Sequence, residues 1–258
     1  MEITWLGTAG FKIRTGSHVI LLDPYLTRSD KAFPKQGIRA SDLDEVNSIF
    51  ISHGHFDHVF DIPEIMADNN AFVYCSEDTG LLLEKRGVKR EVIMKVVSDS
   101  TEFDLKYMRA AAFFSSHVKF DIKLLAQTMM KINFRIFKIL SVLRAYPCGQ
   151  ILAWQFEIEN RHVLFFGSAG LCEQELKIMA EKHVDILLVP LQGHSDICDI
   201  AFEYVRILKP AIVIPHHHDD FFPPVSRLVD ISEFVTRVHK ELKSTRVLSL
   251  KMNRSVNI

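Results

Sequence analysis

The sequence predicts an α/β sandwich in which two mixed β-sheets pack face to face and helices cover their outer faces. Three observations lead to this prediction. The chain opens with short strand-like runs separated by tight turns, and then changes to an alternation of strands and helices. The second half of the 258-residue chain repeats this order. Both halves place histidines directly after a predicted strand, so two sheets are expected to present them at one rim.

The first half is expected to contain three strands of a β-meander, two strand–helix pairs and two further strands. Runs rich in β-branched and aromatic residues, bounded by Gly, Ser and Asp-Pro signals, define the strands. These strands are Glu2 to Leu6, Phe11 to Arg14, Val19 to Leu22, Ser48 to Ser52, Ala71 to Cys75, Glu91 to Val97 and Tyr107 to Ser115. The helices are Asp61 to Asn69 and Asp78 to Arg86, and a polar loop is expected from about Thr27 to Gln36.

The second half is expected to begin with a hairpin and to continue as strand–helix units. Ile151 to Ile158 and His162 to Gly167 flank the turn Glu159-Asn160-Arg161. Further strands are Ile186 to Pro190, Ala211 to Pro215 and Arg246 to Leu250, and the helices are Glu173 to Lys182, Ile200 to Lys209 and Ser232 to Leu242. Nothing marks a flexible linker, so residues 1–258 are expected to form a single domain.

Composition narrows the function classes. Hydrophobic residues make up 48% of the chain and charged residues 24%, with a formal net charge of -1, so neither nucleic acid nor an anionic membrane is an expected partner. The four cysteines have no CxxC spacing and are expected to be reduced thiols. The first residues read as a strand rather than a signal peptide, and no apolar run approaches the ~20 residues that span a bilayer. A cytoplasmic location is therefore expected.

A basic segment interrupts the strand–helix pattern and predicts a helical insertion at about residues 120–147. Ile122 to Tyr146 holds five basic residues and no acidic one. Gln127, Lys131, Arg135 and Lys138 fall on one face of the predicted amphipathic helix. Such a helix could cover a site as a lid, form a dimer contact, touch a membrane surface transiently, or simply pack on the core.

The segment His53-Gly54-His55-Phe56-Asp57-His58 is the strongest chemical signal in the sequence. It follows the apolar run Ser48 to Ile51, so its side chains are expected at a sheet rim. Imidazole and carboxylate groups together suit zinc, iron or manganese, and no thiol lies within the cluster.

Other histidines follow predicted strands in the same way. His117 comes after an apolar run that ends at Phe114, and His216 comes after Ala211 to Pro215. His217 and His218 adjoin His216, which is closest to the strand end. His194 follows the strand Ile186 to Pro190 and is a candidate for substrate contact or for a catalytic acid, or else an exposed loop residue.

The motif from His53 to His58 resembles the HxHxDH signature of the metallo-β-lactamase-fold hydrolases. The resemblance covers most of the chain, and it implies a four-layer αββα sandwich. Within that superfamily the chain is most similar to the branch that contains L-ascorbate-6-phosphate lactonase and relatives of N-acyl-phosphatidylethanolamine phospholipase D. The segments Trp5-Leu6-Gly7 and Leu22-Asp23-Pro24 support this placement.

The resemblance implies two metal sites. His53, His55 and His117 would hold one ion, and Asp57, His58 and His216 would hold the other. Ser168 stands where the family places an aspartate that bridges both ions, and a neutral hydroxyl is a poor bridging ligand. Three arrangements therefore stay open: one ion, two ions bridged by water or hydroxide alone, or a substitute carboxylate. The candidate substitutes are Asp219, Asp220 and Asp23.

The resulting prediction is a hydrolase with one or two zinc ions, or manganese or iron, that cleaves a phosphodiester, lactone or related ester with a metal-activated water. Asp57 would orient the nucleophile and accept its proton, and His194 or His217 would serve as the acid. The expected substrate is a small-molecule or lipid-like ester, and the chain could form a homo-oligomer. Two alternatives are a catalytically altered metal-binding module, because of Ser168, and a di-iron redox protein of the same fold.

Overall fold

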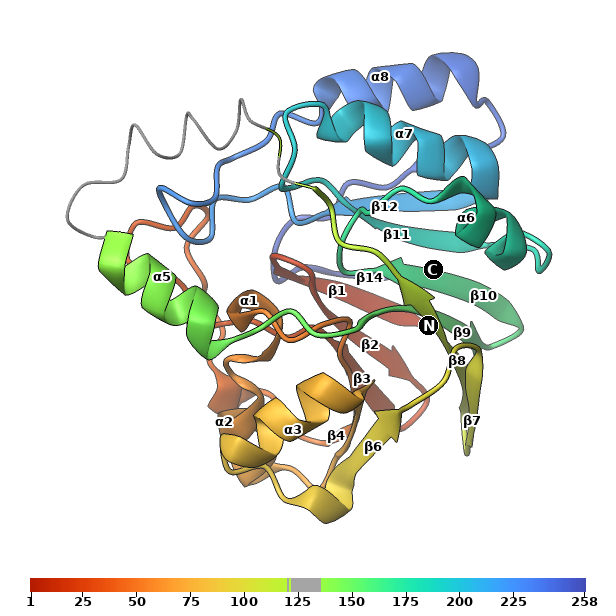
Figure 1. Cartoon of the computed structure of the whole chain (residues 1–258). Helices are drawn as coiled ribbons and strands as arrows, with labels where there is room; N and C mark the ends of the chain where they lie inside the picture. The colour runs from red at the N-terminus through yellow and green to blue at the C-terminus, as the bar shows by residue number, and fades with distance from the viewer. Residues whose placement is uncertain (120, 122–135) are drawn as a thin grey trace.

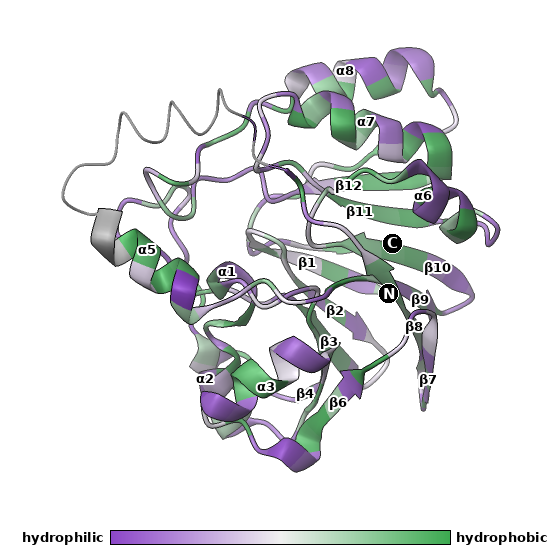
Figure 2. Cartoon of the chain, viewed as in Figure 1, coloured by the Kyte–Doolittle hydropathy of each residue, from purple (hydrophilic) through white to green (hydrophobic). Residues whose placement is uncertain are grey.

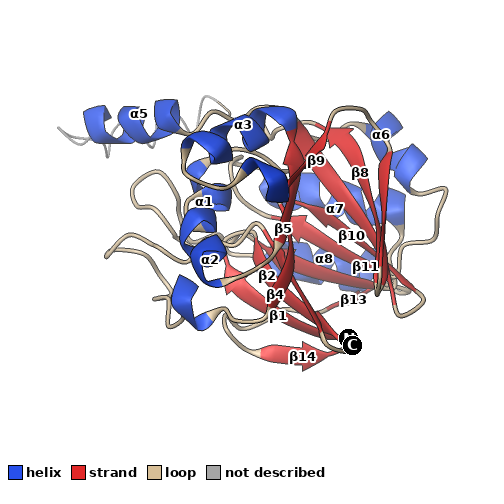
Figure 3. Ribbon diagram, turned by 90° about the horizontal axis from the view of Figure 1, so that it is seen from below, coloured by secondary structure: helices blue, strands red, loops and turns tan. Residues whose placement is uncertain are grey.

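Two sheets of seven strands each lie face to face in the computed structural model, which describes residues 1–119, 121 and 136–258. Helices lie on the outer face of each sheet (Figures 1 and 3). The architecture therefore has four layers, helix–sheet–sheet–helix, and confirms the predicted sandwich. Strands of both sheets end at one rim of this sandwich, and the loops that follow them carry the histidines of the predicted site.

The first sheet has the strand order β14-β1-β2-β3-β4-β5-β6. The strands from β14 to β3 pair antiparallel, and those from β3 to β6 pair parallel. This mixture follows from the sequence, because tight turns join the first three strands whereas helices join the parallel ones. The strands are β1 Glu2–Gly7, β2 Gly10–Thr15, β3 His18–Leu22, β4 Val46–Phe50, β5 Phe72–Ser76, β6 Ile93–Val96 and β14 Ser255–Asn257.

The second sheet has the strand order β13-β12-β11-β10-β9-β8-β7. Its parallel part runs from β13 to β10, and its antiparallel part runs from β10 to β7. The two sheets are therefore built alike. The strands are β7 Thr101–Leu105, β8 Met108–Ser115, β9 Ile151–Ile158, β10 Arg161–Phe166, β11 Ile186–Pro190, β12 Ile212–His216 and β13 Arg246–Val247.

Helices α1 to α3 cover the first sheet and α6 to α8 cover the second (Figure 1). In the described part of the chain the α-helices are α1 Phe56–Val59, α2 Ile62–Asp68, α3 Glu77–Lys85, α5 Ile136–Ala145, α6 Glu173–Met179, α7 Ile197–Leu208 and α8 Ser232–Glu241. Short 3₁₀-helices span Ala40–Asp42 and Arg90–Val92. Figure 2 shows hydrophobic residues along the strands of both sheets, whereas α6 and α8 carry hydrophilic residues. This is the pattern expected of helices with one face in water.

The main core lies between the two sheets. Phe50, Trp154 and Phe156 are buried there, and the ring centroids of Phe50 lie 4.9 Å from those of Trp154 and Phe156. A hydrogen bond from a side chain to the backbone also joins the two sheets: Trp154 Nε1 donates to the Ile51 carbonyl at 3.0 Å. The end of β4 and the beginning of β9 are thereby fixed against each other.

The chain ends differently from the prediction. A last strand was expected over Arg246 to Leu250, but β13 ends at Val247. Leu248 and Leu250 instead pack into the core between the sheets, and the chain crosses to the first sheet to form β14. Strand β7 and the short helix α1 were not expected either.

The predicted insertion contains helix α5, but Gln127, Lys131 and Arg135 of its basic face lie outside the described residues. Within α5, Ile139 is buried, whereas Leu140 and Leu143 are exposed. None of the helices in the described ranges has both the length and the apolar composition that crossing a bilayer requires. Roles of this segment as a lid, a dimer contact or a membrane contact stay predictions.

Candidate metal centre

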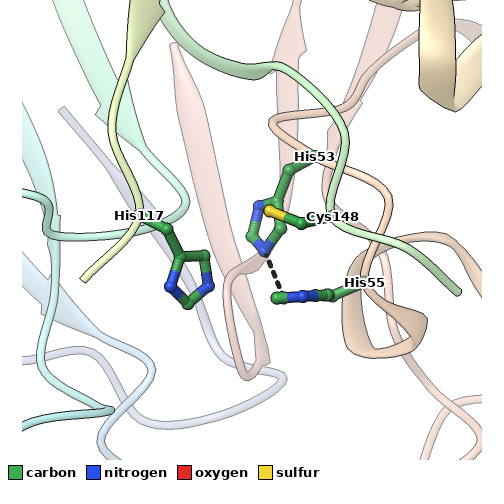
Figure 4. Close-up of side chains that lie close together, drawn as sticks. All are labelled: His53, His55, His117 and Cys148. Carbon is green, nitrogen blue, oxygen red and sulfur yellow. Dashed lines mark hydrogen bonds between the residues drawn. The ribbon is translucent and has the colours of Figure 1, made fainter. Parts of the chain in front are cut away.

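Loops from both sheets converge at one rim of the sandwich. His53 and His55 follow β4, His117 follows β8, and His217 follows β12. Cys148 comes from the segment that joins α5 to β9. Figure 4 shows the side chains of His53, His55, His117 and Cys148 close together, although they come from three separate parts of the chain. The predicted convergence of histidines at strand ends is therefore present in the structure.

The first donor group consists of His53, His55, His117 and Cys148. One ligand atom from each residue can be chosen so that all four lie within 4.8 Å of one another. Nε2 of His53 lies 3.0 Å from Nδ1 of His55. Two nitrogens bound to one tetrahedral zinc ion at about 2.0–2.1 Å would lie roughly 3.3 Å apart. The spacing therefore fits two ligands on one divalent cation.

Neighbouring groups orient the imidazoles of this centre. Nδ1 of His117 lies 2.7 Å from the Val118 carbonyl oxygen, which can only accept a hydrogen bond. His117 must therefore carry its proton on Nδ1 and leave Nε2 as a lone-pair donor. Nδ1 of His53 lies 2.9 Å from Ser52 Oγ, an arrangement that leaves Nε2 of His53 facing His55. A polar partner on the far ring nitrogen is the usual support of a metal-binding histidine.

The second donor group consists of Asp57, His58 and His217, whose ligand atoms also lie within 4.8 Å of one another. Oδ2 of Asp57 lies 3.6 Å from Nε2 of His58 and 3.4 Å from Nε2 of His217. All three residues are buried. Asp57 and His58 belong to α1, so this single turn of helix directs both side chains to the centre.

A buried carboxylate, Asp23, lies beside both groups and forms a third set of donor atoms with His53 and His58, all within 4.8 Å of one another. It accepts hydrogen bonds from the Ser52 amide at 2.7 Å and the Ser52 hydroxyl at 2.5 Å, and it lies 2.7 Å from Nδ1 of His58. A Cβ atom on Gly167 would come within 2.5 Å of the Asp23 carboxylate and 2.0 Å of Ser52 Oγ, so only glycine fits there. Asp23 therefore orients His58 directly and His53 through Ser52.

Burial keeps the histidines of the first donor group neutral. It lowers the pKa of His53 well below its ordinary value and the pKa of His55 to about 4, and it lowers the pKa of His117. The neighbouring histidines lower these pKa values further. Neutral imidazoles have a free lone pair at neutral pH, which a cation requires.

Pairing of opposite charges sets the direction of the pKa shifts of His58 and Asp57 in the second group. Burial alone lowers the pKa of His58, but the carboxylates of Asp23 and Asp57 outweigh burial and raise it. Burial alone raises the pKa of Asp57, but His58 and His217 outweigh it and hold this pKa below its ordinary value. Asp57 is therefore ionised. In the first group, burial and then Asp57 raise the pKa of the Cys148 thiol to about 11.

His217 takes the place that the sequence analysis assigned to His216. His216 is the last residue of β12, and strand alternation turns its ring into the core, 5.1 Å from the ring of Phe11 and 5.6 Å from that of Phe165. His217 has a φ of 56°, and its amide donates to the Thr8 carbonyl at 2.8 Å. The left-handed backbone conformation of His217 directs its own side chain to Asp57, whereas that of His216 points into the core.

Two of the candidate substitutes for the bridging aspartate, Asp219 and Asp220, are engaged elsewhere, whereas the third, Asp23, lies with His53 and His58. Asp219 accepts hydrogen bonds from the Thr8 amide and pairs with Arg28, and Asp220 accepts one from the Ser226 hydroxyl at 2.6 Å. Ser168 accepts a hydrogen bond from the Val118 amide at 3.0 Å. Ser168 therefore positions the segment that carries His117.

His194 lies outside both donor groups. Its Nδ1 accepts a hydrogen bond from the Asp196 amide at 3.0 Å and lies 3.5 Å from an Asp121 carboxylate oxygen. Asp121 follows His117 by four positions, so the His194 loop adjoins the loop of the first group. A role in proton transfer stays a prediction.

Cys148 was not predicted as a ligand from the sequence, and His217 was predicted only as a candidate acid. Three consecutive histidines signal a site, but the backbone turn that selects the second one has no sequence signal of its own. Cys148 lies far along the chain from the motif, and its only local signal is its position between Pro147 and Gly149.

Comparisons with known proteins show what the sequence and the fold are similar to. A metal-dependent hydrolase of the UPF0173 group from Listeria welshimeri is 27% identical over 227 residues, which cover 86% of each chain. The fold is similar to that of Igni18, a metallo hydrolase from the archaeon Ignicoccus hospitalis, with a TM-score of 0.74 at 19% identity over 99% of this chain and 97% of that one.

A likeness of fold extends to CmlA, a diiron β-hydroxylase from Streptomyces venezuelae. Its TM-score is 0.66 at 16% identity, and the match covers all of this chain and 54% of CmlA. The family model described as the beta-lactamase superfamily domain matches residues 2–217, which include every residue of both donor groups. This chain therefore belongs to the beta-lactamase superfamily and has the metallo-β-lactamase fold.

Proposed function

We propose that this protein is a metal-dependent hydrolase that cleaves a phosphodiester, lactone or related ester with a metal-activated water. The observation that carries the proposal is the pair of adjacent donor groups, in which three neutral imidazoles of the first group and the ionised carboxylate of the second converge from loops of both sheets. The curated relatives at 27–28% identity carry the name metal-dependent hydrolase, which supports the same reading.

The donor chemistry fits one or two zinc ions, with manganese or iron as alternatives. His53, His55 and His117 would hold one ion, and Asp57, His58 and His217 would hold a second. A divalent cation in such a centre lowers the pKa of its water from about 15.7 toward 7 and polarises a substrate carbonyl or phosphoryl oxygen. The absence of a carboxylate at Ser168 weakens the coupling between the two positions.

The chain's own residues then serve the reaction. Asp57 is ionised and stands among the second group, where it can orient the attacking water and accept its proton. Asp23 holds the rings of His53 and His58 in place. His194 is our candidate for the acid at the leaving group, because its loop adjoins that of His117.

The proposed substrate is a small-molecule or lipid-like ester in the cytoplasm. Of the branches in the superfamily, the one of L-ascorbate-6-phosphate lactonase and N-acyl-phosphatidylethanolamine phospholipase D relatives remains our proposal for its placement, on the sequence segments given above. Small-molecule esters and lipid-like esters both carry a phosphoryl or carbonyl oxygen that a cation can polarise.

A redox role is the second candidate, since CmlA shares the fold. The resemblance of the motif implies that a diiron site would carry a glutamate at position 55, whereas this chain has His55, whose imidazole lies 3.0 Å from that of His53. A binding module without turnover is the third. Hydrolysis is favoured over both because relatives that match 86% of this chain carry the name metal-dependent hydrolase.

The test compares the wild type with His55→Ala and with the control His183→Ala, whose ring is exposed outside the site. Each protein is loaded with zinc and assayed on bis(p-nitrophenyl) phosphate, a p-nitrophenyl ester and a simple lactone. We expect the wild type and the control to hydrolyse at least one of them, and His55→Ala to fall to background.

A chelator should abolish this turnover, and added zinc should restore it. Turnover that survives both the chelator and His55→Ala would contradict the proposal. A wild type that binds zinc yet hydrolyses none of the three compounds would favour a binding module.

A further inference from the structure

Cys148 places a sulfur donor among the three imidazoles of the first donor group. One ligand atom from each of His53, His55, His117 and Cys148 lies within 4.8 Å of the others, and Figure 4 shows the sulfur beside the ring of His53. Three nitrogens and one sulfur form a complete ligand set for a tetrahedral ion. The other free cysteines that the structure describes are in none of the donor groups found there.

The glycine of the motif brings the Cys148 segment to this position. The Gly54 amide donates to the Cys148 carbonyl at 2.8 Å. A Cβ atom on residue 54 would lie 2.3 Å from the Pro147 carbonyl oxygen, closer than any side chain allows. Gly54, which stands between two metal-binding histidines, is therefore the residue that admits the backbone of Cys148.

Contacts with α3 fix the same segment from the other side. The Gln150 amide donates to Asp78 Oδ2 at 3.1 Å, and the Arg86 guanidinium donates to the Ala145 carbonyl at 2.9 Å. The Arg86 guanidinium also lies over the ring of Tyr146, 4.1 Å from its centroid. Cys148 is thus held between anchors on both sides rather than placed at the tip of a free loop.

The geometry points to Cys148 as the fourth protein ligand of the cation held by His53, His55 and His117. This inference rests on the proposed metal-dependent function. On coordination the S–H bond breaks, a sulfur–metal bond forms and the proton passes to solvent. The site would then be closed by protein ligands, and the positions for water and substrate would lie beside Asp57, His58 and His217. A sulfur ligand also favours zinc over manganese.

Cobalt(II) reports on this ligand directly, since a thiolate ligand adds a charge-transfer band in the near ultraviolet to the visible bands of a tetrahedral ion. The full chain is freed of metal with a chelator and titrated with cobalt chloride, as wild type, Cys148→Ser and the control Cys172→Ser. We expect the charge-transfer band in the wild type and the control, and its loss in Cys148→Ser.

Thiol titration gives a second measurement that does not depend on turnover. Cobalt or zinc should protect one more thiol from modification in the wild type and in Cys172→Ser than in Cys148→Ser. Cobalt affinity should fall about 10-fold or more in Cys148→Ser, since loss of a supporting group alone costs about that much. Near-ultraviolet circular dichroism confirms that each variant is folded.

The outcomes separate this inference from the proposed function. Visible cobalt bands in the wild type without a charge-transfer band, or a charge-transfer band that persists in Cys148→Ser, would overturn the role of Cys148 and leave the metal centre standing. A wild type that binds neither cobalt nor zinc would overturn the proposed function itself.

Discussion

Asp23 shows how one residue organises the centre without lying between its ligands. Its carboxylate accepts two hydrogen bonds from Ser52 and faces Nδ1 of His58. The Asp23 side chain is fully buried, and a Cβ atom on Gly167 would lie 2.5 Å from its carboxylate. Such outer carboxylates fix the ring orientation and tautomer of metal-binding histidines. The sequence offered Asp23 only as a bridging ligand, because nothing in the sequence places it behind His58.

We expect Asp23→Asn to weaken zinc binding by about 10- to 100-fold, because an amide accepts the hydrogen bond from His58 Nδ1 less strongly than a carboxylate does. A chelator competition assay measures the affinity, with the exposed Asp30→Asn as the control. Equal affinity in Asp23→Asn and the wild type would show that Asp23 has no part in orienting the ligands.

Gly54→Ala tests the close approach of the Cys148 segment. The added Cβ would lie 2.3 Å from a backbone oxygen, so the segment must shift, at a cost of about 1–3 kcal/mol in the free energy of unfolding. Urea denaturation measures this cost. In the control Gly37→Ala the nearest atom is 3.8 Å away, so its stability should match that of the wild type. Equal stability of both variants would contradict the contact.

Ser168→Asp should raise the affinity for a second cation, because a carboxylate can bridge two ions where a hydroxyl cannot. The Ser168 hydroxyl accepts a hydrogen bond from the Val118 amide, and an aspartate retains an acceptor for it. Equivalents of zinc per chain, measured by elemental analysis after equilibration with limiting zinc, should be higher in Ser168→Asp than in Ser168→Ala. No difference between these two variants would mean that residue 168 does not reach the ions.

At the scale of elements, strand alternation decides which histidine reaches the centre. β12 is a buried strand that ends at His216, so His216 continues its inward face and packs between Phe11 and Phe165. The sequence predicted that strand, with its bounds shifted by one residue, and that shift made His216 look like the first residue of the loop. Strand bounds are the least certain part of such a prediction.

His217→Ala should therefore lower the zinc content by up to one equivalent per chain, whereas His216→Leu should retain the content of the wild type. Leucine has no ring nitrogen, but it can fill an apolar site between two phenylalanines. Elemental analysis of each folded variant decides whether His216 or His217 is the ligand. A loss of zinc in His216→Leu with none in His217→Ala would restore His216 as the ligand.

At the scale of the whole molecule, the pattern of the sequence was sufficient for the four layers. Alternating strands and helices predicted both sheets, and histidines after strands predicted the rim that holds the centre. The histidines predicted for one ion, His53, His55 and His117, lie in one donor group, and His58 lies in another. That they bind a cation stays a prediction. The pairing of β1 with β14, at the two ends of the chain, was not predicted, because β14 has only three residues and gives little strand signal.

Cys148 illustrates the limit of sequence reasoning at this scale. Its position depends on three contacts that join distant parts of the chain: the Gly54 amide, the anchor at Asp78 and the contact of Arg86 with Ala145. None of these contacts has a periodic or local signal. Only the assembled sandwich brings the segment before β9 to the loop after β4.

The metal content of the whole protein decides whether the donor groups bind a cation. Elemental analysis would be made on the wild type, His55→Ala and the control His183→Ala, each purified without chelator and again after zinc or manganese is added. We expect at least about one equivalent per chain in the wild type and the control, and a clear loss in His55→Ala. A wild type that holds no divalent cation even after zinc or manganese is supplied would contradict it.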